Sequence, residues 1–328
     1  MIEFRIDRDH AGVRLDKVLR QRLPSVPASH LFKMIRTKKV RVNGKRASVN
    51  QPLAAGDVVT LRGTEERLLA PAPPGRKPPA VDPGVLRILL EDDWMMAVDK
   101  PSGMAVHPGS GITGGTLVDY VRAHLGARAV RNGFAASPAH RLDRDTSGVI
   151  LVAVRRPAMV HFTEVFTAGR AVKRYLVLAK GRMPRPSGRI DLPLSEHQQT
   201  AASRARRGVN MQEAATRWQV LRQGGEAALL ACTLETGRTH QIRRHLAAIG
   251  HPVAGDKKYG DFAFNREARA RWGLKRLFLH AAGIEFPHPA DGRRVRLEAE
   301  LPDELRAVLE RAGIEPPASD AAQGRREA

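Results

Sequence analysis

The sequence HRLDRDTSG occupies residues 140–148, directly ahead of the apolar run 149–154, which is typical of a buried β-strand. Within it, the carboxylate of Asp143 is flanked by the guanidinium groups of Arg141 and Arg144. The Thr, Ser and Gly that follow are residues that favour a tight turn. Such a loop is suited to hold one carboxylate still in front of an anionic substrate, so Asp143 is a candidate nucleophile.

Around this loop, short strands and helices follow one another without a regular β-α-β repeat. Apolar runs predict strands over 86–91, 95–99, 174–179, 216–221, 227–234, 276–286 and 295–298. Helical spacing predicts helices over 117–125, 158–166, 239–248 and 303–312. Strands outnumber helices, which favours an α+β domain with a mixed, mainly antiparallel sheet and flanking helices over residues 85–318.

Residues 1–63 read as a separate small unit with two helices, a strand at 40–42, an Asn-Gly turn and a strand at 55–61. This stretch holds 14 Lys or Arg against 5 Asp or Glu. Its central cations are Lys33, Arg36, Lys38, Lys39, Arg41, Lys45 and Arg46. A solvated basic face is the simpler interpretation, but so little acidic compensation favours a surface that binds phosphates.

The remaining segments and the composition narrow the class of protein. Residues 64–84 are Pro-rich and predict a semi-rigid linker, and the small polar tail 319–328 predicts disorder. A net charge of +21 indicates a polyanionic partner. No apolar run approaches the roughly 18 residues of a transmembrane helix, and the N-terminus is unlike a signal peptide. A single cysteine, Cys232, argues against disulfides and fits a reducing cytoplasm.

A second polar stretch, GRTHQIRRHL at residues 237–246, reads as a loop entering a helix, where backbone amides favour anions. From this helix Arg243 can direct its guanidinium fork at a carboxylate. The histidines at 240, 245 and 251 are five and six residues apart, which does not place them on one helical face. We therefore expect no metal site here.

Together these segments resemble the RluA family of RNA pseudouridine synthases. HRLDRDTSG at 140–148 is similar to the central motif of that family, KPSG at 100–103 to its first motif, KRY at 173–175 to its tyrosine motif, and GRTHQIR at 237–243 with GHP at 250–252 and GD at 255–256 to its third. Residues 14–57 resemble an S4 RNA-binding domain. The likeness is closest to the RluC-type branch, whose members act on large-subunit ribosomal RNA.

The resemblance implies a pseudouridine synthase fold preceded by an S4 domain, and an isomerisation that needs no cofactor. It implies that Asp143 is catalytic, either attacking the ribose or assisting proton removal from it. Because burial disfavours a carboxylate, a cation must accompany it, and Arg243 is the expected partner. Tyr175 is expected to stack on the uracil of a flipped nucleotide. The other expected substrate-binding residues are His140, Arg141, Arg238, His240 and Gln241.

Two other functions remain open at this stage. The same chemistry could act on transfer RNA, or the fold could serve as a non-catalytic RNA-binding factor in ribosome assembly. The presence of Asp143, Tyr175 and Arg243 together argues for an enzyme. We expect a monomer that acts on RNA in the cytoplasm without a membrane, and the sequence does not specify which uridines are modified.

Overall fold

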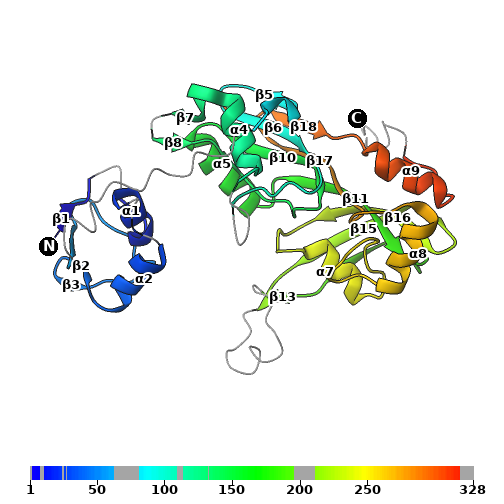
Figure 1. Cartoon of the computed structure of the whole chain (residues 1–328), viewed down its shortest axis with the longest axis horizontal. Coiled ribbons are helices and arrows are strands. Elements are labelled where there is room, and N and C mark those ends of the chain that lie inside the picture. Colours follow the sequence, from blue (N-terminus) through cyan, green and yellow to red (C-terminus); the bar gives the residue numbers. More distant parts are fainter. Residues whose placement is uncertain are drawn as a thin grey trace. The chain divides into compact units, whose positions relative to one another are not determined.

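The computed structural model describes residues 2–7, 11–23, 26, 28–62, 81–108, 114–131, 133–195 and 211–317. Within it the chain divides into two compact units, Met1–Pro78 and Pro79–Ala328 (Figure 1). Of the expected linker, residues 64–80 lie outside the described residues, and 81–84 lead into a short 3-10 helix, Pro83–Val85. The expected tail at 319–328 also lies outside them. No helix in these described ranges has the length and apolar character to span a membrane.

The N-terminal unit packs two helices against a small sheet. The helices are α1 (Leu15–Arg22) and α2 (Ala28–Arg36), and the strands are β1 (Ile2–Arg5), β2 (Val40–Val42), β3 (Lys45–Arg46) and β4 (Val58–Leu61). The strand order is β1-β4-β2-β3, and all pairs are antiparallel. Asn43 and Gly44 both have positive φ angles, as the turn between β2 and β3 requires.

The second unit is built on one large sheet with the strand order β12-β15-β16-β11-β17-β10-β6-β5. These strands are β5 (Arg87–Glu91), β6 (Met95–Lys100), β10 (Ser147–Ala153), β11 (Val172–Lys180), β12 (Ser187–Asp191), β15 (Ala215–Gly224), β16 (Ala227–Leu234) and β17 (Leu279–Pro287). The strands β9 (Ser137–Pro138) and β18 (Arg294–Glu298) pair with β10 and β17. Short two-stranded ribbons, β7 (Val130–Arg131) with β8 (Phe134–Ala135) and β13 (Leu194–Ser195) with β14 (Met211–Gln212), lie apart from it. Among described pairs only β10 with β17 is parallel, so the mixed, mainly antiparallel α+β fold is confirmed.

Helices cover both faces of this sheet, because apolar side chains alternate along its strands. One hydrophobic cluster joins Ile150 and Val152 to α4 (Leu117–Leu125) and α7 (Gln241–Ala248). On the other face, α5 (Arg156–Thr167) packs on the β6–β10–β17 half. The helices α8 (Phe262–Trp272) and α9 (Asp303–Arg311) pack on the β11–β16 half (Figure 1).

Gly148 permits the close approach of β10 and β17 at the centre of the sheet. Its φ is +111°, and a Cβ atom there would lie 2.2 Å from the carbonyl oxygen of Ala281. Any side chain would therefore force the two strands apart. The glycine that ends HRLDRDTSG is thus required by the strand pairing immediately behind the Asp143 loop.

Three elements of this unit differ from expectation. The helix α8 was not foreseen, although the Asp261 carboxylate caps it by accepting a hydrogen bond from Phe264 N and Gly273 ends it with a φ of 74°. The strand expected over 276–286 begins instead at Leu279, because Arg276 turns its side chain toward Glu304 and Ser147 ahead of the sheet. The short edge strand β12 was also missed.

Candidate active site

A cavity of about 300 Å³ opens between the 140–146 loop, the start of β11 and the loop that precedes α7. The residues that line it include every catalytic or substrate-binding residue that the sequence predicts in the second unit. These are His140, Arg141, Asp143, Tyr175, Arg238, His240, Gln241 and Arg243. Separate segments of the chain thus converge on one site.

Asp143 faces Arg243 across the cavity, although 100 residues separate them in sequence. Arg243 Nη1 donates a 2.8 Å hydrogen bond to Asp143 Oδ2. The side chain of Asp143 is only 16% exposed, so this ion pair is largely shielded from water. The other oxygen, Oδ1, lies 3.6 Å from His240 Nε2. Arg243 therefore holds one carboxylate oxygen, whereas Oδ1 makes no hydrogen bond within the described ranges.

Arg243 is itself held by a second carboxylate, Asp256. Its Nε and Nη2 atoms donate hydrogen bonds of 2.7 and 2.8 Å to the two oxygens of Asp256, a bidentate arrangement. The Asp256 side chain is fully buried and also accepts from the backbone amides of Lys258 and Tyr259. One edge of the guanidinium is thus clamped, and the remaining Nη1 points at Asp143.

The electrostatics of Arg243 and Asp256 favour the charged form of both groups. Burial alone would lower the pKa of Arg243, but its hydrogen bonds to Asp256 and Asp143 raise it above the ordinary value. Burial alone would raise the pKa of Asp256, but the hydrogen bonds from Arg243 and the backbone hold it below the ordinary value. Arg243 therefore keeps its positive charge beside Asp143 over the working pH range.

His240 begins α7 in a left-handed conformation, with φ 54° and ψ 31°. A non-glycine residue in this region is strained by about 1 kcal/mol or more, and such strain concentrates at functional sites. Its Nδ1 lies 2.9 Å from the Tyr259 hydroxyl, and burial lowers the pKa of the imidazole below its usual range. The strained backbone keeps this ring beside Asp143.

Tyr175 and Lys173 lie two residues apart on β11 and both line the cavity, because alternate residues of a strand share a face. Burial, and then the negative charge of Asp143, raise the pKa of Tyr175, so its phenol stays neutral. Burial lowers the pKa of Lys173 to about 8. The Lys173 ammonium sits 4.1 Å from the centre of the Phe166 ring, a cation–π contact at the cavity wall.

His140 lies against Phe166 on the same wall, with the rings edge to face at 5.4 Å. Its Nε2 accepts a 3.1 Å hydrogen bond from Leu151 N, which leaves the proton of the neutral ring on Nδ1. Burial, and then the charge of Lys173, lower the pKa of His140 to about 3. The ring is therefore neutral at ordinary pH.

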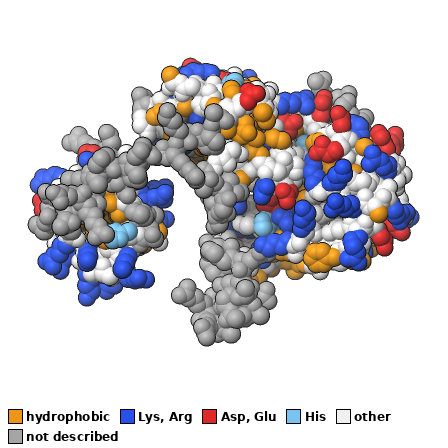
Figure 2. Space-filling model, in the orientation of Figure 1, with side chains coloured by type: hydrophobic (Ala, Val, Ile, Leu, Met, Phe, Trp, Pro, Cys, Tyr) orange, Lys and Arg blue, Asp and Glu red, His pale blue; other side chains and the backbone are white. Residues whose placement is uncertain are grey.

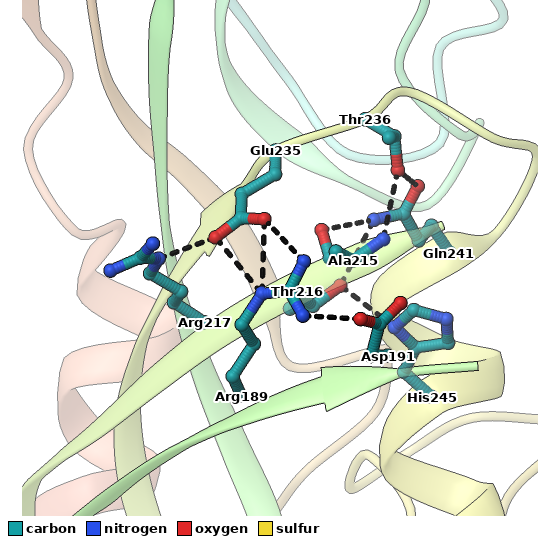
Figure 3. Close-up of polar contacts among 9 residues, drawn as sticks. All are labelled: Arg189, Asp191, Ala215, Thr216, Arg217, Glu235, Thr236, Gln241 and His245. Atoms are coloured by element: carbon teal, nitrogen blue, oxygen red, sulfur yellow. Dashed lines mark hydrogen bonds and ion pairs between the residues drawn. The ribbon is translucent and has the colours of Figure 1, made fainter. Parts of the chain in front are cut away.

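Gln241 lines the cavity but directs its amide into the protein (Figure 3). The Oε1 atom accepts from Thr236 Oγ1 and Arg238 N, and the Nε2 atom donates to Ala215 O and Thr216 Oγ1. Thr216 Oγ1 also contacts His245 Nδ1 at 2.9 Å. This network ties the start of α7 to β15, which positions the loop that carries Arg238 and His240.

Figure 3 also shows Glu235, which follows β16, between Arg189 of β12 and Arg217 of β15, outside this network.

The two expected cations at the cavity rim, Arg141 and Arg238, are both exposed. Arg238 Nε donates to the carbonyl oxygen of Glu213 at 3.1 Å, and no ion pair of Arg141 occurs within the described ranges. These rim cations are accessible to an anionic ligand.

The seven cations expected to bind RNA lie in the N-terminal unit, on α2, β2, β3 and the turns beside them. Lys33, Arg36, Lys38, Lys39, Arg41, Lys45 and Arg46 are all exposed. Over residues 28–62, which the structure describes without a gap, none of the seven makes an ion pair. Arg41 Nη1 donates to the Gly44 carbonyl oxygen.

The three histidines weighed as metal ligands make separate contacts. His240 contacts Tyr259, His245 contacts Thr216 and the Leu192 carbonyl, and His251 Nδ1 lies 3.0 Å from the Lys180 carbonyl oxygen. Each ring is thus engaged with a different part of the unit.

Sequence reasoning gave no role to Asp256, Lys173, Phe166 or Tyr259. Lys173 could have been found, because it precedes Tyr175 by two residues on a predicted strand. Asp256 was matched only within the GD motif at 255–256, and no local pattern assigns it to Arg243, which lies 13 residues earlier on a helix that the chain has already left. Its role as a clamp is recognisable only once that loop has folded back.

Comparisons with known proteins agree on one family. Residues 94–248 match the model of the RNA pseudouridylate synthases, and residues 13–59 match that of the S4 domain. The chain is 37% identical over 306 residues to the ribosomal large subunit pseudouridine synthase C of Vibrio cholerae, a match that covers 93% of this chain and 94% of that protein. It is 38% identical over 312 residues to the protein of the same name from Escherichia coli K12, covering 93% and 95%. The solved structure of human RNA pseudouridylate synthase domain containing 4 superposes with a TM-score of 0.57 at 26% identity, covering 70% of this chain and 94% of that one.

Proposed function

This chain belongs to the RNA pseudouridine synthase family, and from that premise we propose that it isomerises uridines of large-subunit ribosomal RNA with Asp143 as the catalytic residue. The choice of substrate is supported by the relatives in Vibrio cholerae and Escherichia coli, which are large-subunit synthases and match almost the whole chain. The N-terminal S4 domain, with its exposed cations, supports an RNA partner of high negative charge.

The observation that carries the proposal is the arrangement around Asp143. Arg243 binds one carboxylate oxygen at 2.8 Å and is clamped from behind by Asp256. The carboxylate is therefore paired with a cation and oriented before a substrate arrives, which is what a preorganised nucleophile or base requires. The side chain of Asp143 lines the cavity, and its second oxygen, Oδ1, is the reacting atom in our proposal.

Pseudouridine formation breaks the bond from uracil N1 to ribose C1′, rotates the base and forms a bond from C5 to C1′. The proton on C5 leaves and N1 gains one, so the reaction is an isomerisation that consumes no cofactor. Asp143 either attacks C1′ to form a covalent intermediate or removes a proton from the ribose. Both routes use the same free carboxylate oxygen.

The neighbouring side chains suit the handling of a neutral base. Tyr175 stays uncharged, because burial and the nearby Asp143 raise its pKa, and its ring can stack on uracil. His140, which is also neutral, and Phe166 continue the wall. A cavity of about 300 Å³ holds a nucleotide only after it leaves the RNA stack, so we propose base flipping, with Arg141 at the rim to hold the opened RNA.

Mapping of pseudouridine in cells tests this proposal directly. Total RNA would be mapped from cells that lack the gene, complemented with either wild type or Asp143→Asn. We expect sites in large-subunit ribosomal RNA that return only with the wild type. Sites that return in transfer RNA would move the substrate to that class, and an absence of dependent sites would favour the non-catalytic assembly factor.

The same variant separates chemistry from binding in the purified protein. Asp143→Asn keeps the shape and removes the charge, so we expect turnover to be abolished and RNA affinity to be nearly unchanged. Retention of even a tenth of the wild-type rate would exclude Asp143 as the nucleophile. We propose further that the enzyme acts as a monomer in the cytoplasm.

A further inference from the structure

Helix α2 of the N-terminal unit leaves one large apolar side chain in water. Leu31, Met34 and Ile35 follow helical spacing and are buried in the core of the unit. Phe32 lies off this face and is 40% exposed. It shares the solvent face with Arg36, four residues later, and so stands beside a cation instead of in the core. Core packing does not account for this aromatic ring.

The exposed ring lines a groove between α2 and the segment that begins at β3 and ends at Val49. The groove encloses about 660 Å³. Ile35, Ala47 and Val49 make its lining apolar beside Phe32. Lys33, Arg36 and Arg46 supply its charges, and Ser48 adds a hydroxyl. An apolar floor bounded by three cations is an amphipathic site.

Among the described residues of this unit, no carboxylate balances these three cations. Asp16 pairs with Arg14, and Asp7 pairs with Arg22. The Asp57 carboxylate accepts from Asn43 and from the amide of Ala54. Figure 2 shows Lys and Arg side chains gathered on the visible part of this unit with few acidic ones between them. Three like charges around one groove repel one another unless an anion neutralises them.

We propose that this groove binds one unpaired nucleotide of the RNA, with its base stacked on Phe32 and the adjoining phosphates at Lys33, Arg36 and Arg46. The proposal deepens the function above and rests on RNA being the partner. A nucleotide matches both halves of the site, since its base is flat and apolar on its faces and its phosphates are anionic. An acidic peptide would satisfy the cations but would leave the aromatic ring without a partner.

The groove therefore selects for RNA that offers an unstacked base, such as a loop or a bulge. A base inside a duplex is already stacked on its neighbours and cannot cover Phe32 without leaving them. Phosphates are present in both forms, so the three cations alone would not discriminate. The aromatic ring is the specificity-determining part of the site.

Binding of the full chain to a single-stranded oligouridylate and to a fully paired RNA duplex of equal length tests the proposal. We expect Phe32→Ala to weaken binding of the single strand by roughly 5- to 100-fold, the range typical of removing one stacked base, and to leave duplex binding unchanged. Phe32→Trp should retain the affinity and Phe32→Leu should lose it, because leucine is apolar but has no ring. Phe262→Ala, at another exposed phenylalanine (61%), is the matched control and should have no effect.

The salt dependence identifies which half of the site each variant removes. Phe32→Ala should shift the affinity equally at every salt concentration, whereas Arg46→Gln should reduce the slope of log affinity against log salt by roughly 0.7, as removal of one phosphate-binding cation does for a single strand. An unchanged affinity for Phe32→Ala, or an equal loss on the duplex, would overturn the proposal in favour of a protein contact or a general charge effect.

Photocrosslinking locates the base independently of affinity. We expect 4-thiouridine in the oligomer to crosslink to the peptide that contains Phe32, and crosslinks confined to the second unit would overturn the assignment. All of these measurements can be made in the Asp143→Asn background. Failure of the stacking site is thereby distinguishable from failure of the catalytic proposal, which is read from pseudouridine alone.

Discussion

The candidate active site and the N-terminal basic surface both depend on cations but use them in opposite ways. Arg243 is only 11% exposed and is shared between two carboxylates, which hold its guanidinium in one orientation. The cations on α2, β2 and β3 are exposed, and over residues 28–62 they have no carboxylate partner. A clamped charge can orient a reacting group, whereas free charges provide affinity that grows with each phosphate bound. We therefore expect activity at the first region to depend on geometry and affinity at the second to depend mainly on charge, with the ring of Phe32 adding a preference for an unstacked base.

Replacing Arg243 by lysine should severely disrupt the geometry of the candidate active site. Lysine keeps the charge but cannot bind Asp256 with two nitrogens and Asp143 with a third. We expect the single-turnover rate of pseudouridine formation to fall by about 100-fold, as misplacement of a reacting group by about 1 Å can do. Arg244→Lys, whose arginine instead binds Ser195, should leave the rate unchanged. Equal rates for the two variants would mean that charge without orientation suffices.

Asp256→Asn should have a smaller effect on the same rate, of roughly 10-fold, because Arg243 keeps Asp143 as a partner while losing its clamp. Breaking a buried ion pair should also lower the free energy of unfolding in urea by about 3 kcal/mol. Asp291→Asn, at a carboxylate that is 55% exposed and paired with Arg293, should change neither quantity measurably. A stability loss with full activity would make Asp256 structural only.

The pH dependence of KM should identify Lys173 as a charge that titrates inside the cavity. Because burial lowers its pKa to about 8, Lys173 is positive below that pH and neutral above it. We expect KM for RNA to rise by roughly fivefold between pH 7 and 9, because deprotonation removes one charge-assisted hydrogen bond to the RNA. Lys173→Arg should flatten this profile, since a guanidinium stays charged. An unaltered profile in that variant would assign the titration to another group.

Neutralising Lys38, Lys39 and Arg41 together should leave turnover at saturating RNA unchanged and weaken binding. The slope of log affinity against log salt should fall by roughly one unit for each phosphate that the protein no longer binds. Neutralising Arg266, Arg269 and Lys275, around α8 of the second unit, provides the matched control. Equal losses of affinity from both triple variants would mean that net charge, and not this surface, determines affinity.

The sequence predicted which residues line the cavity better than it predicted the contacts that they make. His140, Asp143, Tyr175 and Arg243 come from motifs that can be read without a fold, and all four line one cavity. Gln241 was expected to bind substrate, yet its amide is engaged with Thr236, Arg238, Ala215 and Thr216. A motif identifies residues that matter but does not distinguish a side chain facing the ligand from one that holds the loop.

Elements set by local signals were also predicted more readily than those set by packing. Helices α4, α5 and α9 follow apolar spacing closely enough to be found within about two residues of their ends. The helix α8 buries Phe264, Ala268 and Trp272 along one face, but Phe262 and two alanines are exposed off that face. The apolar pattern is therefore weak, and the Asp and Gly caps are the clearer signals. The pairing of Arg243 with Asp256 depends on the path of the chain after α7, which no local pattern encodes.

The position of β17 has a consequence for how the protein is made. This strand, Leu279–Pro287, lies between β10 and β11 and joins the two halves of the sheet, yet it is among the last parts of the chain to be synthesised. Contacts between distant parts of a chain form slowly, and domains emerge from the ribosome in order. We therefore expect the N-terminal unit to fold while translation continues. The cavity, which Leu279 of β17 helps to line, should form only after β17 has been synthesised.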